Sequence, residues 1–77
     1  MSVKTYILIQ TEVGKANSVA SAIKQIPGVT LAEGVIGPYD VIMCAESESM
    51  EAFGRAILSK VQAVPGITHT LTCPVTN

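Results

Sequence analysis

The chain has 77 residues, of which 48% are hydrophobic and 14% are charged. That length fits one domain over residues 1–77, since a typical domain already takes about 100 to 150 residues, and the apolar fraction excludes a disordered chain. Five basic residues against six acidic ones exclude the basic surface that direct nucleic-acid binding requires.

The first half of the chain predicts a strand, a helix and a second strand. Residues 3–10 are rich in β-branched and aromatic side chains, which favours a strand. Apolar residues recur at helical spacing over residues 16–26, and a Pro-Gly pair then ends the helix. Residues 29–36 predict the second strand, with an irregularity expected at Gly34.

The second half repeats this order after a turn. Residues 37–40 read Gly-Pro-Tyr-Asp, which is typical of a tight turn. Residues 41–45 predict the third strand, and residues 46–49 supply the capping oxygens and acids that favour a helix start. The helix over residues 50–61 carries an apolar stripe, and the alternating residues 67–73 predict the fourth strand.

An internal repeat joins the two halves. Residues 26–30 read Ile-Pro-Gly-Val-Thr and residues 64–68 read Val-Pro-Gly-Ile-Thr, each after a helix. The resulting βαββαβ order predicts a ferredoxin-like α+β fold, with a four-stranded antiparallel sheet in the order 4-1-3-2. Both helices are expected on one face of this sheet.

The other sheet face should be covered by a second copy of the chain. Both sides of the predicted strands carry apolar residues, whereas a solvent-facing side would alternate to polar ones. So short a chain also has a marginal core. Cys44 and Cys73 are too few for a disulfide scaffold and, with one histidine, for a zinc site. We therefore expect a homo-oligomer with reduced thiols and no metal.

The sequence offers no signs of targeting or catalysis. No apolar run approaches the roughly 18 residues of a membrane span, and no signal-peptide core is visible, so we expect a cytoplasmic protein. His69 alternates with threonines in a strand and has no neighbouring acid, which favours a structural role over a catalytic one. Glycine-rich phosphate loops are absent. We expect neither enzyme activity nor a cofactor.

Two groups of residues are candidates for ligand binding. In the turn, Gly37 would let ligand atoms approach the backbone, and Asp40 could pair with an ammonium group of the ligand. Tyr39 could pack against an apolar side chain of the ligand. These are the parts that an α-amino acid zwitterion needs, although Asp40 could equally hold the turn by bonding local N–H groups. Thr70 and Thr72 lie along one predicted strand with Thr68, where threonine is also simply a good strand former.

These motifs resemble the Lrp/AsnC transcription regulators. The resemblance is to their C-terminal ligand-binding domain, often called the RAM domain, and covers essentially the whole chain. It rests on the βαββαβ order and on residues spread along the chain: Gly37, Asp40, Phe53, Pro65, Gly66, Ile67, Thr70 and Thr72.

The resemblance implies a small-molecule-binding regulatory module without its DNA-binding half, which in the family would precede residue 1. Such domains form sheet-to-sheet dimers of the dimeric α+β barrel type, which assemble into rings. The module would therefore assemble with itself or join full-length regulators. Effectors, usually amino acids, bind near the turn, so Gly37, Tyr39 and Asp40 become expected contacts, with Thr70 and Thr72 as secondary ones. Cys73-Pro74 departs from the family, which usually continues its last strand with apolar residues.

Two other functions stay open. A small dimeric α+β barrel enzyme, such as a cofactor-free monooxygenase, would need a polar pocket with several His, Trp or Tyr, and this chain has one histidine and no tryptophan. A ligand-free structural ring subunit would use the same oligomerising faces without a binding site.

Overall fold

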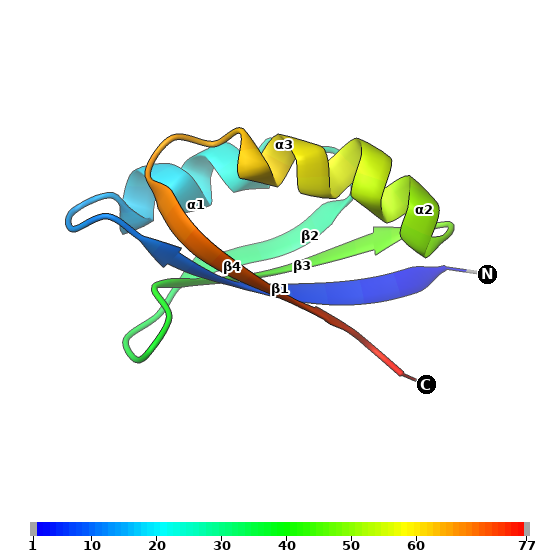
Figure 1. Ribbon diagram of the computed structural model, residues 1–77, viewed down its shortest axis with the longest axis horizontal. Helices are drawn as coiled ribbons and strands as arrows, with labels where there is room; N and C mark the ends of the chain where they lie inside the picture. Colours follow the sequence, from blue (N-terminus) through cyan, green and yellow to red (C-terminus); the bar gives the residue numbers. More distant parts are fainter. Residues whose placement is uncertain (1, 77) are drawn as a thin grey trace.

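The computed structural model describes residues 2–76, and Figure 1 shows how their strands and helices are arranged. The four strands of the fold are β1 (Val3–Thr11), β2 (Val29–Gly34), β3 (Val41–Ser47) and β4 (Ile67–Pro74). The helical segments are α1 (Ala16–Lys24), α2 (Met50–Phe53), η1 (Gly54–Leu58) and α3 (Ser59–Gln62). None of these helices is long and apolar enough to cross a membrane.

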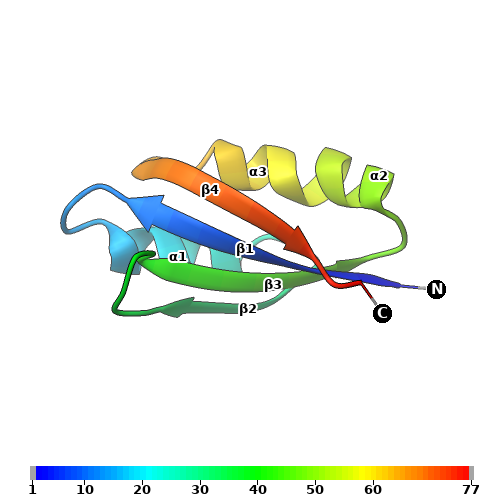
Figure 2. The same cartoon turned by 60° about the horizontal axis from the view of Figure 1, so that its bottom comes forward.

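The strands form one antiparallel sheet in the order β2-β3-β1-β4, with β1 and β3 in its centre. All helices lie on one face of this sheet, and the other face is left uncovered (Figures 1 and 2). The ferredoxin-like βαββαβ fold and the 4-1-3-2 strand order predicted from the sequence are confirmed. Each of the two Pro-Gly pairs lies between a helix and the edge strand that follows it.

The core lies between the sheet and the helices. Because side chains alternate along a strand, every second residue of β1 faces the helices, and three of these residues, Thr5, Ile7 and Ile9, are fully buried. The helices contribute the apolar stripe expected from their spacing. The largest buried side chains of this core are Phe53, Ile7, Ile9, Ile23, Met43, Val19, Val41 and Val61.

The uncovered face, hereafter the open face, is apolar along its middle. The strand register places Tyr6 between Cys44 and Cys73, and Leu8 between Ile42 and Leu71. Leu71 is 44% exposed, so this apolar surface is accessible in the single chain.

Charged residues mark one end of the open face. Lys4 pairs in register with Glu46, and the Lys4 ammonium lies 5.5 Å from the centre of the Tyr6 ring. Tyr6 raises the pKa of Lys4 above its ordinary value.

The second strand differs from its prediction in two ways. It ends at Gly34, not at residue 36, because the Val35 N–H donates to the Asp40 carbonyl and closes a loop there. The expected irregularity at Gly34 was wrong: the register with β3 shifts between Val29 and Leu31. At that shift the hydroxyl of Thr30 donates to the Cys44 carbonyl, which replaces the regular strand pairing.

The second predicted helix is continuous but changes its winding in the middle. The Ser49 side chain accepts from the Ala52 N–H, which confirms the predicted cap. Segment η1 then follows as a π-helical turn. Phe53, Ile57 and Val61 are spaced four residues apart, and in an α-helix such residues drift by about 40° per step. A wider π turn reduces this drift and keeps all three side chains buried.

Candidate functional site

The turn over residues 37–40, hereafter the 37–40 turn, connects β2 with β3 and lies beside the end of β1 (Figures 1 and 2). Antiparallel pairing of β1 with β3 brings the last residues of β1 next to the first residue of β3. Residues separated by nearly 30 positions in sequence therefore meet at this end of the sheet.

Asp40 anchors the turn to β1. Its N–H donates to the Ile9 carbonyl at 2.8 Å, and its Oδ2 accepts from the Thr11 N–H at 2.8 Å. The Thr11 hydroxyl lies 3.4 Å from the same Oδ2. From the sequence, Asp40 could either bind a ligand ammonium or accept from a local backbone N–H. In the structure its side chain does accept from a backbone N–H, but that group belongs to Thr11 of another strand.

Gln10 reaches the middle of the turn. Its side-chain Nε2 donates to the Pro38 carbonyl at 3.0 Å. Neither Gln10 nor Thr11 was predicted as a site residue, because no local motif links them to residues 37–40. The predicted strand order could have indicated both residues, because antiparallel pairing places the end of β1 beside the start of β3.

Three polar groups of the 37–40 turn make no hydrogen bond within the described residues. Among residues 2–76, no hydrogen bond uses the N–H of Gly37, the N–H of Tyr39 or the Oδ1 of Asp40. Gly37 has a φ of 154°, which side chains rarely adopt, and no atom lies within 4 Å of where a side chain would begin. The neighbouring Ile36 is fully exposed. Two N–H donors and one carboxylate oxygen can together hold a carboxylate and an ammonium group.

The two threonines lie apart from this group. Thr70 pairs with Ile9 and Thr72 with Ile7, so both lie on β4, across β1 from β3. Two strand spacings make about 10 Å, which separates them from the turn. The expected ladder also breaks at Thr68, where the register between β1 and β4 shifts. The structure thus brings Gly37, Tyr39 and Asp40 together without Thr70 or Thr72.

His69 lies opposite Gln10 in the β1–β4 register and is exposed. No hydrogen bond or ion pair involves its side chain within residues 2–76. In the same part of the chain, no three His, Cys, Asp or Glu side chains lie close enough to hold a metal ion.

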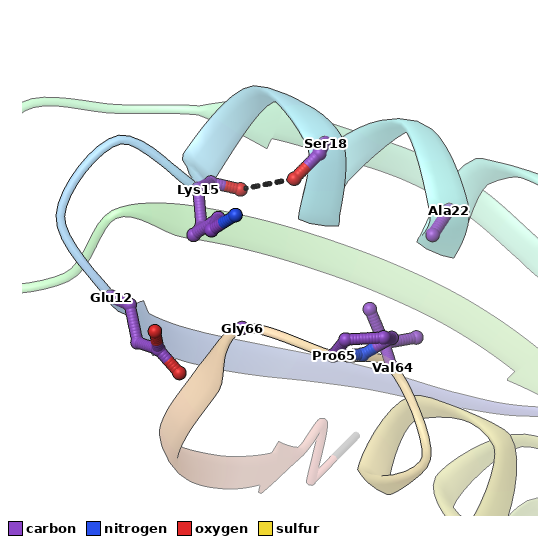
Figure 3. A pocket seen from close by; sticks show the side chains of 7 residues that line it. All are labelled: Glu12, Lys15, Ser18, Ala22, Val64, Pro65 and Gly66. Atoms are coloured by element: carbon purple, nitrogen blue, oxygen red, sulfur yellow. Dashed lines mark hydrogen bonds between the residues drawn. The ribbon is translucent and has the colours of Figure 1, made fainter.

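A separate groove of about 470 Å³ lies between α1 and the loop that precedes β4 (Figure 3). Glu12 and Lys15 are among the residues that line it, and both are exposed. The Ser18 hydroxyl bonds to the Lys15 carbonyl of its own helix and is not directed at a ligand. Apart from Ser18, the polar side chains that line the groove are Glu12 and Lys15. Its lining residues are Glu12, Lys15, Ser18, Ala22, Val64, Pro65 and Gly66.

Comparison with known proteins gives a family match over almost the entire chain. Residues 4–77 match the family model described as Lrp/AsnC ligand binding domain. No curated protein sequence matches the chain.

Solved structures share the fold. FFRP-DM1 is 30% identical with a TM-score of 0.88, and the match covers 96% of this chain and 99% of that one. E. coli AsnC is 22% identical with a TM-score of 0.88, over 97% of this chain and 51% of AsnC. The transcriptional regulator NMB0573 of Neisseria meningitidis, solved with L-Met, is 18% identical with a TM-score of 0.82, over 97% and 50%. The chain spans about half the length of the latter two regulators.

Proposed function

Since the chain belongs to the family of Lrp/AsnC ligand-binding domains, we propose that it is a regulatory module that binds an α-amino acid at the 37–40 turn. The observation that carries the proposal is the set of unused polar groups on the turn: the N–H groups of Gly37 and Tyr39 and the Oδ1 of Asp40.

The zwitterion would bind with its two charged groups on different parts of the turn. Its carboxylate accepts from the Gly37 and Tyr39 N–H groups, because backbone donors in a turn bind anions well. Its ammonium donates to the Oδ1 of Asp40, whose other oxygen is already held by Thr11. The half-buried ring of Tyr39 then borders the ligand side chain. Crystallisation of the Neisseria regulator with L-Met supports this class of ligand.

Thr70 and Thr72 rank below the turn as ligand contacts, because β1 lies between them and Asp40. We propose no catalytic role for His69, which lies opposite Gln10 in the sheet register and pairs with no acid group within residues 2–76.

The same proposal includes self-association through the open face. Its apolar middle, with Leu71 44% exposed, supports burial against the open face of a second copy. Dimers of this kind would assemble into a ring or join full-length regulators, which carry this domain as about half of their length in the case of E. coli AsnC.

Calorimetric titration of the protein with each of the twenty amino acids tests the ligand class. We expect one amino acid, or a few of similar side chain, to bind, and the remainder to give no heat beyond dilution. If none of the twenty binds the oligomeric protein, the proposed function is wrong.

A further inference from the structure

We propose that Gln10 is a positioning residue for the 37–40 turn: its side-chain amide orients the Pro38–Tyr39 peptide so that the Tyr39 N–H faces the ligand carboxylate. The inference rests on the proposed function in one respect, that a carboxylate-bearing ligand binds at this turn. Gln10 lies on β1, outside the turn, and would act on the site without touching the ligand.

The hydrogen bonds around the turn single out Gln10. Asp40 is held by Ile9 and Thr11, but it stands at the end of the turn, where β3 begins. Over residues 36–39, the bond from Gln10 Nε2 to the Pro38 carbonyl is the one hydrogen bond found within residues 2–76. The middle of the turn is therefore held from β1 by a single side chain.

Because a peptide bond is planar, the hydrogen bond to the Pro38 carbonyl also sets the direction of the Tyr39 N–H. The Pro38–Tyr39 peptide is trans, so its C=O and its N–H point in opposite directions within one plane. Gln10 draws the carbonyl toward β1, and the Tyr39 N–H is consequently directed away from β1, toward the outer side of the turn. Pro38 has no N–H. Its carbonyl is therefore its one backbone group that can form a hydrogen bond with Gln10.

The contact thus prepares one of the two carboxylate donors before a ligand arrives. Without it, the peptide can rotate, and a ligand must order the turn as it binds, which lowers affinity. A hydrogen bond of this kind contributes a net factor of about 2 to 13 in an equilibrium constant.

The test uses ¹⁵N-labelled protein and two simple probes, acetate for the carboxylate subsite and methylammonium for the Asp40 subsite. Gln10→Met keeps the length of the side chain and removes its donor. Gln10→Leu is a second variant, which also removes the donor and adds no charge that would act on either probe. Gln25→Met is the matched control, because Gln25 is exposed and its side chain makes no hydrogen bond within residues 2–76.

We expect acetate to shift the Tyr39 amide resonance in the wild type and in Gln25→Met. Both Gln10 variants should bind acetate about 2- to 13-fold more weakly, with methylammonium affinity unchanged. Equal acetate affinity in the Gln10 variants, or a Tyr39 amide that acetate does not shift in the wild type, overturns the inference. Equal losses for both probes indicate a general structural role and overturn it as well. Absence of amino-acid binding, with the acetate result as expected, rejects only the proposed function.

Discussion

Asp40 makes hydrogen bonds with both its backbone and its side chain, and most of them reach β1. Its two carboxylate oxygens differ in their surroundings, because Oδ2 accepts from Thr11 and Oδ1 makes no bond within residues 2–76. One residue can therefore hold the turn and present a charged oxygen to a ligand. Substitutions at Asp40 can separate these two roles.

Asp40→Ala should weaken amino-acid binding by about 1.5–3 kcal/mol, because it removes a charge-assisted hydrogen bond to the ammonium. It should also lower the melting temperature, since the Thr11 N–H loses its acceptor. Calorimetry measures the first effect and thermal unfolding the second.

Asp40→Asn is the control for this comparison. The asparagine oxygen can still accept from Thr11, so the variant should melt near the wild-type temperature and yet bind the ligand poorly. If both variants bind as well as the wild type, Asp40 is not the ammonium partner.

Gly28 is a second residue whose role can be measured directly. It has a φ of 99°, and an added Cβ would lie 2.8 Å from Ile57 Cδ1 and 3.3 Å from the Glu46 carbonyl oxygen. Gly28→Ala should therefore destabilise the protein by more than about 1 kcal/mol, through backbone strain and a clash with the core. Chemical denaturation measures this loss.

Gly14→Ala separates the two causes. Gly14 has a φ of 80° but no atom within 4 Å of the added Cβ, so only backbone strain should act there. An equal loss in both variants would show that the contact with Ile57 has no energetic effect.

At the scale of the elements, the register of the sheet decides which side chains are neighbours. β1 runs between β3 and β4, and Tyr6 pairs with Cys44 on one side and with Cys73 on the other. The two cysteines consequently share a row of the sheet without being adjacent. Both are free thiols, and Cys44 is buried.

This register predicts that Cys44 and Cys73 form no disulfide within one chain. Two strand spacings place their Cα atoms about 10 Å apart, whereas a disulfide requires less than about 7 Å. The intact mass under non-reducing conditions should equal the mass after reduction. A non-reduced mass lower by about two daltons, from loss of two hydrogens, would show that the register is wrong.

At the scale of the whole molecule, one sheet face has helices and the other has none (Figure 2). A chain of 77 residues buries a limited share of its surface. Burial of the open face against a second copy would add the missing apolar contact. Stability should then depend on protein concentration.

Leu71→Lys tests this dependence, because Leu71 lies on the open face and is 44% exposed. The substitution places a charge in the expected interface, so sedimentation at micromolar concentration should show a shift from dimer or larger species toward monomer. Val13→Lys is the control, since Val13 is fully exposed in the loop before α1 and should leave assembly unchanged. A wild-type protein that sediments as a folded monomer would contradict the proposed dimer.

The local elements and their order could be predicted from the sequence. Hydrophobic periodicity located each strand and helix to within a few residues, because side chains alternate in strands and recur every 3.6 residues in helices. With the repeated Pro-Gly pairs, this order was sufficient for the βαββαβ fold. The turn residues Gly37, Tyr39 and Asp40 were also recognisable, since a turn is a local structure.

The contacts between residues distant in sequence depend on strand pairing and packing. The contacts of Gln10 and Thr11 with the turn join positions 28 and 29 residues apart, and no local pattern encodes them. The separation of Thr70 from Asp40, in contrast, already follows from the predicted strand order, which places β1 between β3 and β4. The π-helical turn depends on packing, because it keeps Phe53, Ile57 and Val61 on one buried face. Local propensity fixes the conformation of short segments, but strand pairing and core packing determine which distant side chains lie close together.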